Sequence, residues 1–123
     1  MLTILVVEDN ACIRKPMARL LRFEGFETFC AGNGQEALDA LDLVRPDLIL
    51  LDLMMPVMGG VEFLTILRDN PLWANLPVIV MTARPPDDDS VRAARLLGAK
   101  EYFLTADFTL GQLCTSIRRN LAA

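Results

Sequence analysis

Short runs of apolar residues alternate along the chain with segments in which apolar residues recur every three or four positions. The apolar runs cover residues 4–7, 28–31, 48–51, 78–81 and 102–104, and each has the length of a strand. The helical spacing covers residues 14–23, 36–44, 61–68, 91–97 and 110–121. Strands that alternate with helices in this way predict a parallel sheet with helices packed on both faces.

The most continuously apolar runs are the first, third and fourth, which is typical of central strands buried on both faces. We therefore predict an α/β fold, namely a flavodoxin-like (βα)5 doubly wound parallel sheet with strand order 2-1-3-4-5. Residues 1–123 are expected to form a single domain, because no linker, repeat or low-complexity segment interrupts them. This order places the first strand beside the third, at the topological switch point.

Carboxylates follow these two neighbouring strands directly. Glu8 and Asp9 come after the first apolar run, and Asp52 comes after the third. Because the carboxyl ends of parallel strands open on one edge of the sheet, the three side chains are expected to converge there. Carboxylates that share a pocket repel one another, and a divalent cation relieves this repulsion. The sequence therefore predicts a Mg²⁺ site that serves phosphoryl chemistry.

Composition excludes several classes of function. The formal net charge is −4 and no block of basic residues is present, so we expect no direct binding to nucleic acid. No apolar stretch approaches the ~18–20 residues that span a bilayer, and no basic segment precedes the first apolar run. We therefore expect a cytoplasmic domain with no membrane contact.

The chain contains no histidine, which rules out Ser-His-Asp catalysis, Cys-His catalysis and His-ligated zinc within it. Its three cysteines, Cys12, Cys30 and Cys114, are far apart in sequence, and we expect free thiols. Any histidine that takes part in the chemistry must belong to a partner.

Several motifs, in order and over essentially the whole chain, make the sequence resemble the receiver domain of two-component response regulators. They are Ile-Leu-Val-Val-Glu-Asp at 4–9, Asp-Leu-Ile-Leu-Leu-Asp at 47–52, Met-Pro-Val-Met-Gly-Gly at 55–60, Thr-Ala at 82–83, and Gly-Ala at 98–99 before Tyr102. The resemblance implies that Asp52 accepts a phosphoryl group from a phosphohistidine, as an acyl phosphate. The donor would be a sensor histidine kinase or a histidine phosphotransfer protein.

The same resemblance assigns roles to the residues around Asp52. It implies that Mg²⁺ is held by Glu8, Asp9, Asp52 and the backbone carbonyl of Met54. It also implies that the Thr82 hydroxyl binds the phosphoryl oxygens and that Tyr102 turns inward with Thr82 when the domain switches. The other interpretation of Tyr102 is that of a packed core aromatic. Any enzymatic activity would be limited to the phosphorylation and dephosphorylation of the domain itself.

The resemblance also implies where partners bind. The surface formed by the fourth helix, the fifth strand and the fifth helix would contact a downstream protein or an output domain, or would form a homodimer. No output domain is expected within these residues, because residue 123 closely follows the fifth helical segment.

One departure from the family pattern concerns charge. Receiver domains carry a Lys-Pro pair shortly after the aromatic at position 102. Counting forward from Tyr102 puts Thr105 at the lysine position, whereas counting back from Phe108 puts Ala106 there, with Asp107 at the proline. Arg84 is either a substitute cation or a solvated loop residue. The missing lysine supports an alternative function, a pseudo-receiver that acts as a phosphorylation-independent protein-interaction module.

Overall fold

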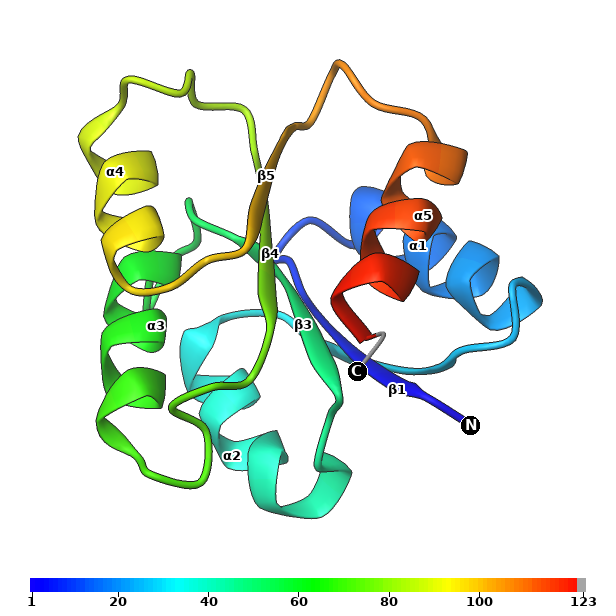
Figure 1. Cartoon of the computed structure of the whole chain (residues 1–123), viewed down its shortest axis with the longest axis horizontal. Helices are drawn as coiled ribbons and strands as arrows, with labels where there is room; N and C mark the ends of the chain where they lie inside the picture. The colour runs from blue at the N-terminus through cyan, green and yellow to red at the C-terminus, as the bar shows by residue number, and fades with distance from the viewer. Residues whose placement is uncertain (122–123) are drawn as a thin grey trace.

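The computed structural model describes residues 1–121 and contains the predicted alternation of strands and helices (Figure 1). The strands are β1 (Thr3–Val7), β2 (Glu27–Ala31), β3 (Leu48–Asp52), β4 (Val78–Thr82) and β5 (Glu101–Leu104). The helices are α1 (Ala11–Phe23), α2 (Gly34–Val44), α3 (Gly60–Asp69), α4 (Asp89–Leu96) and α5 (Leu110–Leu121). Each predicted segment overlaps its observed element, and the differences are confined to the ends.

All five strands are parallel, in the order β2-β1-β3-β4-β5, which confirms the flavodoxin-like fold. In the register of β1 and β3, Val7 lies opposite Leu51, so both strands end at the same level. Every residue of β1 and β4 is buried, and so is all of β3 except Asp52. In the three central strands β1, β3 and β4, the only residue that is not buried is therefore Asp52, at the carboxyl end of β3.

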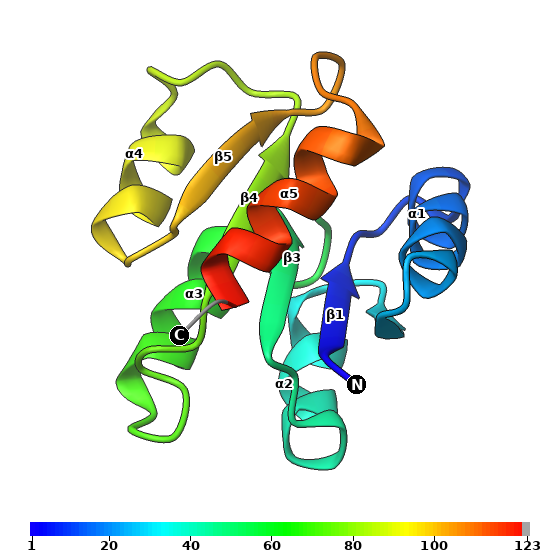
Figure 2. The same ribbon diagram turned by 45° about the vertical axis from the view of Figure 1, so that its right-hand side comes forward.

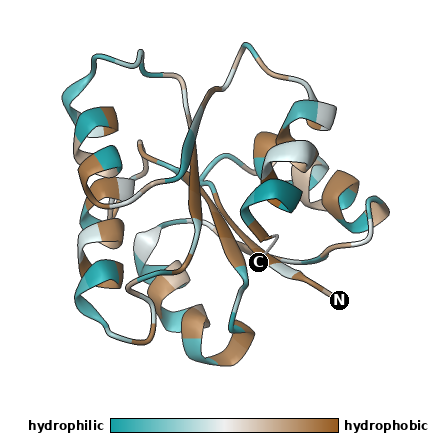
Figure 3. Cartoon of the chain, in the orientation of Figure 1, coloured by the Kyte–Doolittle hydropathy of each residue, from teal (hydrophilic) through white to brown (hydrophobic). Residues whose placement is uncertain are grey.

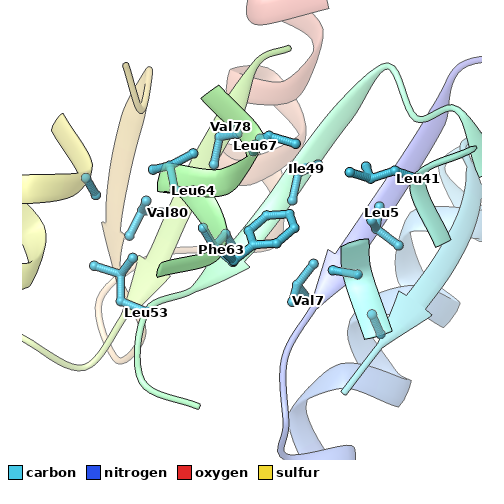
Figure 4. Packing of buried hydrophobic residues seen from close by; sticks show 14 of the residues in the cluster. Leu5, Val7, Leu41, Ile49, Leu53, Phe63, Leu64, Leu67, Val78 and Val80 are labelled. Carbon is cyan, nitrogen blue, oxygen red and sulfur yellow. The ribbon is translucent and has the colours of Figure 1, made fainter. Parts of the chain in front are cut away.

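Alternate residues of the central strands pack into two separate cores. Helices α2, α3 and α4 cover one face of the sheet, and α1 and α5 cover the other (Figures 1 and 2). Leu5 and Val7 belong to the first core, whereas Ile4 and Val6 belong to the second. Figure 4 shows Phe63 of α3 among the residues of the first core, where it is fully buried. The central strands β3 and β4 are largely brown, and therefore apolar, in Figure 3.

Side-chain caps begin four of the helices, and the one before α5 is the Thr109 hydroxyl, which accepts a hydrogen bond from the Gln112 amide at 3.1 Å. The Asn33 side chain accepts a hydrogen bond from the Glu36 amide at 2.9 Å, and Asp88 accepts one from the Ser90 amide at 3.0 Å. Asn10 accepts one from the Cys12 amide at 2.9 Å, so α1 starts two residues after Asp9. Such caps satisfy amide groups that the first helical turn leaves free.

Across residues 1–121, none of the helices combines the length and the apolar character needed to cross a bilayer.

Helix α3 starts in close contact with the end of β3, because residue 60 has no side chain. A Cβ atom on Gly60 would lie 2.6 Å from the Asp52 carbonyl oxygen and 2.7 Å from the Leu53 Cα. Both neighbours are backbone atoms of the segment that carries Asp52. This glycine therefore fixes how closely α3 approaches the carboxyl edge of the sheet.

We expect Gly60→Ala to lower the free energy of unfolding by about 2–3 kcal/mol, because backbone must move to admit the methyl group. Urea denaturation measures the change. Gly59→Ser is the matched control, because a Cβ there makes ordinary contacts with the carbonyl oxygens of Leu53 at 3.5 Å and Met55 at 3.9 Å, and serine is a good N-cap. Equal destabilisation by both substitutions would contradict this explanation.

Candidate functional site

Three carboxylates converge at the carboxyl edge of the sheet, as the sequence predicts. Glu8 and Asp9 follow β1, Asp52 ends β3, and one oxygen from each lies within 4.8 Å of the other two. Glu8 is buried, Asp52 is half-buried and Asp9 is exposed. The group is the kind of all-oxygen donor set that hard divalent cations prefer.

Glu8 carries the largest electrostatic cost in this group. Its side chain is 6% exposed, and its Oε2 atom has no hydrogen-bond partner. Burial, and next the neighbouring Asp52 carboxyl, raise the pKa of Glu8 to about 9, and the charge of Asp9 adds to the increase. Without a cation, Glu8 is therefore protonated at neutral pH.

Arg14 stabilises the backbone that carries the two acids of β1. Its guanidinium donates to the Glu8 carbonyl oxygen at 2.8 Å and to the Asp9 carbonyl oxygen at 3.3 Å. The sequence prediction did not identify this residue. The available signal was its position in the first turn of α1, five residues after Asp9, because a long side chain there reaches back to the end of β1.

The loop after β3 orients the Asp52 side chain. The Met54 amide donates a hydrogen bond to Asp52 Oδ1 at 3.2 Å, and this bond closes an Asx turn, which is common for aspartate. Met54 is exposed and lies beside the three carboxylates at the surface of the site. The structure thus brings together all four residues that the sequence predicts as cation ligands.

Thr82 ends β4, the strand beside β3, and Tyr102 lies on β5; neither lines the cavity next to the carboxylates, and both are linked to the loop after β4. Thr82 is fully buried, and its Oγ1 accepts a hydrogen bond from the Arg84 amide at 3.2 Å. The Tyr102 hydroxyl donates to the Arg84 carbonyl oxygen. Tyr102 is half-buried, packs against the first core, and has the Arg95 guanidinium 5.8 Å from its ring centroid. One residue's backbone therefore connects the two predicted switch side chains.

A cavity of about 250 Å³ lies next to the carboxylates. Its lining residues come from the carboxyl ends of four strands and from α1 and the segment before α5: Glu8, Asp9, Asn10, Ile13, Met17, Asp52, Met54, Met81, Ala83, Thr105 and Phe108. No lysine or arginine is among these lining residues, all of which belong to the described part of the chain. The negative charge of the site is therefore not balanced by a cationic side chain in the cavity wall.

The segment after β5 contributes Thr105 to this cavity. The Thr105 amide donates to the Thr82 carbonyl oxygen at 2.9 Å, which extends the pairing of β4 and β5 by one residue. Neither Ala106 nor Asp107 lines the cavity, so Asp107 does not add its charge there. Arg84 is exposed and also absent from the wall, which favours its interpretation as a solvated loop residue.

Comparison with known proteins identifies the family. The profile described as "Response regulator receiver domain" matches residues 4–118. This chain belongs to the response regulator receiver family. Such a domain acts in two-component signal transduction. Receiver domains generally use Mg²⁺ at an acidic pocket, and this receiver has an acidic cluster formed by Glu8, Asp9 and Asp52.

Two of the similar curated proteins are response regulators of mycobacteria and their relatives. The chain is 36% identical over 118 residues to the DNA-binding response regulator MtrA of Mycobacterium tuberculosis, covering 96% of this chain and 50% of that protein. It is 38% identical over 115 residues to the response regulator MprA of Mycolicibacterium vanbaalenii, covering 94% and 48%. The chain thus spans about half the length of the curated relatives it matches.

Solved structures resemble this receiver over nearly its full length. The chemotaxis protein CheY4 of Vibrio cholerae has a TM-score of 0.87 and 28% identity, with 97% of this chain and 98% of that chain covered. The response regulator TrrA of Thermotoga maritima, solved in complex with Mg²⁺ and BeF, has a TM-score of 0.82 and 31% identity, with 98% and 99% covered.

The raised pKa of Glu8 predicts how stability depends on pH in the absence of divalent cations. Between its ordinary value of 4.5 and about 9, the folded protein holds a proton that the unfolded chain has lost. The free energy of unfolding contributed by Glu8 is therefore intact below pH 4.5 and declines as pH rises toward 9, by up to ~1.4 kcal/mol per pH unit.

Glu8→Gln removes this titration, so the variant should gain stability relative to wild type as pH rises through this window. Urea denaturation across pH with EDTA present measures the difference. Glu62→Gln, which changes an exposed carboxylate of α3, is the control and should follow the wild-type profile. A constant difference between wild type and Glu8→Gln at all pH values would contradict the burial argument.

Proposed function

We propose that this receiver accepts a phosphoryl group on Asp52 from the phosphohistidine of a sensor histidine kinase or a histidine phosphotransfer protein. The observation that carries the proposal is the convergence of Asp52 with Glu8 and Asp9. All three line the cavity, and Asp52 is the half-buried member. We further propose that residues 1–123 form one receiver domain and that it signals through protein contacts, in the cytoplasm.

The chemistry follows from the position of Asp52. A carboxylate oxygen of Asp52 attacks the phosphorus atom, the bond from phosphorus to the imidazole nitrogen breaks, and the histidine leaves with the bonding electron pair. The product is an acyl phosphate on Asp52. The hydrogen bond from the Met54 amide to Asp52 Oδ1 orients the carboxylate and leaves Oδ2 for the attack.

The residues present fit a Mg²⁺ ion. Glu8 Oε2 is buried without a partner, and carboxylate oxygens of Asp9 and Asp52 lie close by. We assign Glu8, Asp9, Asp52 and the Met54 backbone carbonyl as its ligands, directly or through water. When bound, Mg²⁺ would offset the negative charge that repels an incoming phosphoryl group. The Mg²⁺–BeF complex of the similar TrrA structure supports this assignment.

We propose that Thr82 and Tyr102 change conformation when Asp52 is phosphorylated. The Thr82 hydroxyl is at the end of β4, next to Asp52 at the end of the neighbouring strand, and would bind a phosphoryl oxygen. To do so it would exchange its contact with the Arg84 amide. Because Tyr102 binds the Arg84 carbonyl, a shift of this peptide would move Tyr102 as well.

We base the proposed partners on the receiver family and on the curated relatives, which are about twice as long as this chain. MtrA is a DNA-binding response regulator, so we propose that a downstream protein or an output domain receives the signal. The receiver itself has no basic cluster for nucleic acid. The proposed contact surface is formed by α4, β5 and α5, and the same surface would serve a homodimer.

The charge of the cavity supports a second candidate, a pseudo-receiver. We infer that Thr105 stands at the position of the family's lysine, because Thr105 lines the cavity and Ala106 does not. Loss of that cation would weaken the link between phosphorylation and switching. The retained Glu8, Asp9, Asp52 and Thr82 nevertheless favour the phosphoacceptor, because an interaction module has no use for a buried unpartnered carboxylate.

Acetyl phosphate with Mg²⁺ should add one phosphoryl group to the wild-type protein, as measured by intact-mass spectrometry. Asp52→Asn should abolish the addition, because an amide is not a nucleophile of this kind. Asp42→Asn, which changes an exposed carboxylate of α2, is the matched control and should be labelled like wild type. Labelling that persists in Asp52→Asn, or that never occurs in wild type under conditions that label an ordinary receiver, would contradict the proposal.

Thr105→Lys should increase the initial rate of this phosphorylation by about tenfold or more. An ammonium group in the cavity wall offsets the repulsion between the site and the phosphodonor, and ~1.4 kcal/mol in the barrier gives a tenfold change. Thr105→Met is the control, because it adds a side chain of similar length without charge. Equal rates for the two variants would mean that the wall's charge does not limit the reaction.

A further inference from the structure

The cavity continues from the three carboxylates into apolar surroundings. Ile13 and Met17 of α1, Met81 of β4 and Phe108 before α5 line it. Phe108 is held in place by Phe103, with ring centroids 5.2 Å apart. The volume of about 250 Å³ is several times the ~30 Å³ that one water molecule occupies in the liquid. A small molecule with an apolar body therefore fits better here than a water cluster.

The polar end of the same cavity requires positive charge. Glu8 is more than nine-tenths buried, lines the cavity and has an oxygen atom without any partner. When a divalent cation is bound and Glu8 is therefore ionised, the three carboxylates carry a formal charge of −3, and the cation would compensate two of these charges. No cationic side chain of the described residues lines the wall to compensate the third.

We propose that this cavity binds a primary alkylammonium ion. Its nitrogen would donate hydrogen bonds to the carboxylates of Glu8 and Asp52, and its alkyl chain would pack against Met81 and Phe108. A neutral alcohol would leave the charge uncompensated, and a bare ammonium ion would leave the apolar wall without contacts. This proposal rests on the proposed function in one respect, namely that Mg²⁺ binds the same carboxylates.

Two sources can supply an alkylammonium group: a free primary amine, or the lysine side chain of a protein bound at this edge. The cavity reaches solvent beside the exposed residues Asp9, Asn10 and Met54, so either source has access. In both cases the bound cation would compensate charge at Asp52 from outside the chain.

The test is an NMR titration of the ¹⁵N-labelled, Mg²⁺-saturated protein with n-butylammonium chloride at constant ionic strength. We expect saturable shifts of the amides of Met81, Thr105 and Phe108, with a Kd on the order of 1–10 mM for a ligand of this size. n-Butanol and ammonium chloride should each bind at least tenfold more weakly. Butanol or ammonium that binds as tightly as butylammonium, or no saturable shift at these residues, would overturn the proposal.

Thr105→Lys supplies an internal ammonium group and should weaken butylammonium binding at least tenfold. Thr105→Ser, which leaves the cavity open, is the matched control and should bind like wild type. Undiminished binding by Thr105→Lys would also overturn the proposal.

Two further measurements separate the possible outcomes. Tighter binding of N-acetyl-lysine N-methylamide than of butylammonium would identify a partner's lysine as the source, and the reverse order would identify a free amine. The shifts that Mg²⁺ alone causes at Glu8, Asp9 and Asp52 test the metal site independently. Normal Mg²⁺ shifts without a butylammonium response would therefore reject the alkylammonium site and leave the proposed function intact.

Discussion

Repulsion among the carboxylates of Glu8, Asp9 and Asp52 is the interaction on which the rest of this site depends. The parallel pairing of β1 and β3 forces the three side chains to one edge, and their oxygens lie within 4.8 Å of one another. Glu8 is buried there without a hydrogen-bond partner for Oε2. Such an arrangement is stable only with a bound proton or a bound cation. A cation that binds here would therefore displace the proton of Glu8.

The surrounding structure holds these charges in place and connects them to the surface. Arg14 binds the carbonyl oxygens of Glu8 and Asp9, and Gly60 lets α3 approach the end of β3. On the other side, the backbone of Arg84 joins Thr82 to Tyr102. The described contacts thus link the end of β4 to β5 through the backbone of a single residue. The cavity beside the carboxylates has no lysine or arginine among its lining residues in the described part of the chain.

Apolar periodicity was sufficient to predict the five strands and the central position of three of them, because burial on both faces leaves a strong pattern. The full strand order and the convergence of the acids followed from assuming a flavodoxin-like topology. Local pattern could not predict the long-range contacts. The hydrogen bond from Tyr102 to the Arg84 carbonyl joins residues 18 positions apart, and the position of Thr105 in the cavity depends on the register of β4 and β5. Nothing in the sequence indicates that Val57, a β-branched residue, adopts a left-handed φ of 71° in the loop after β3.

Proton release on Mg²⁺ binding tests most directly whether the three carboxylates act as one cation-dependent site. Isothermal calorimetry at pH 7, in buffers of different ionisation enthalpy, gives the number of protons released per ion. The pKa of Glu8, raised to about 9 by burial and by Asp52, predicts release of close to one proton, and close to none from Glu8→Gln. Mg²⁺ binding without proton release from the wild-type protein, or no binding at all, would contradict the account.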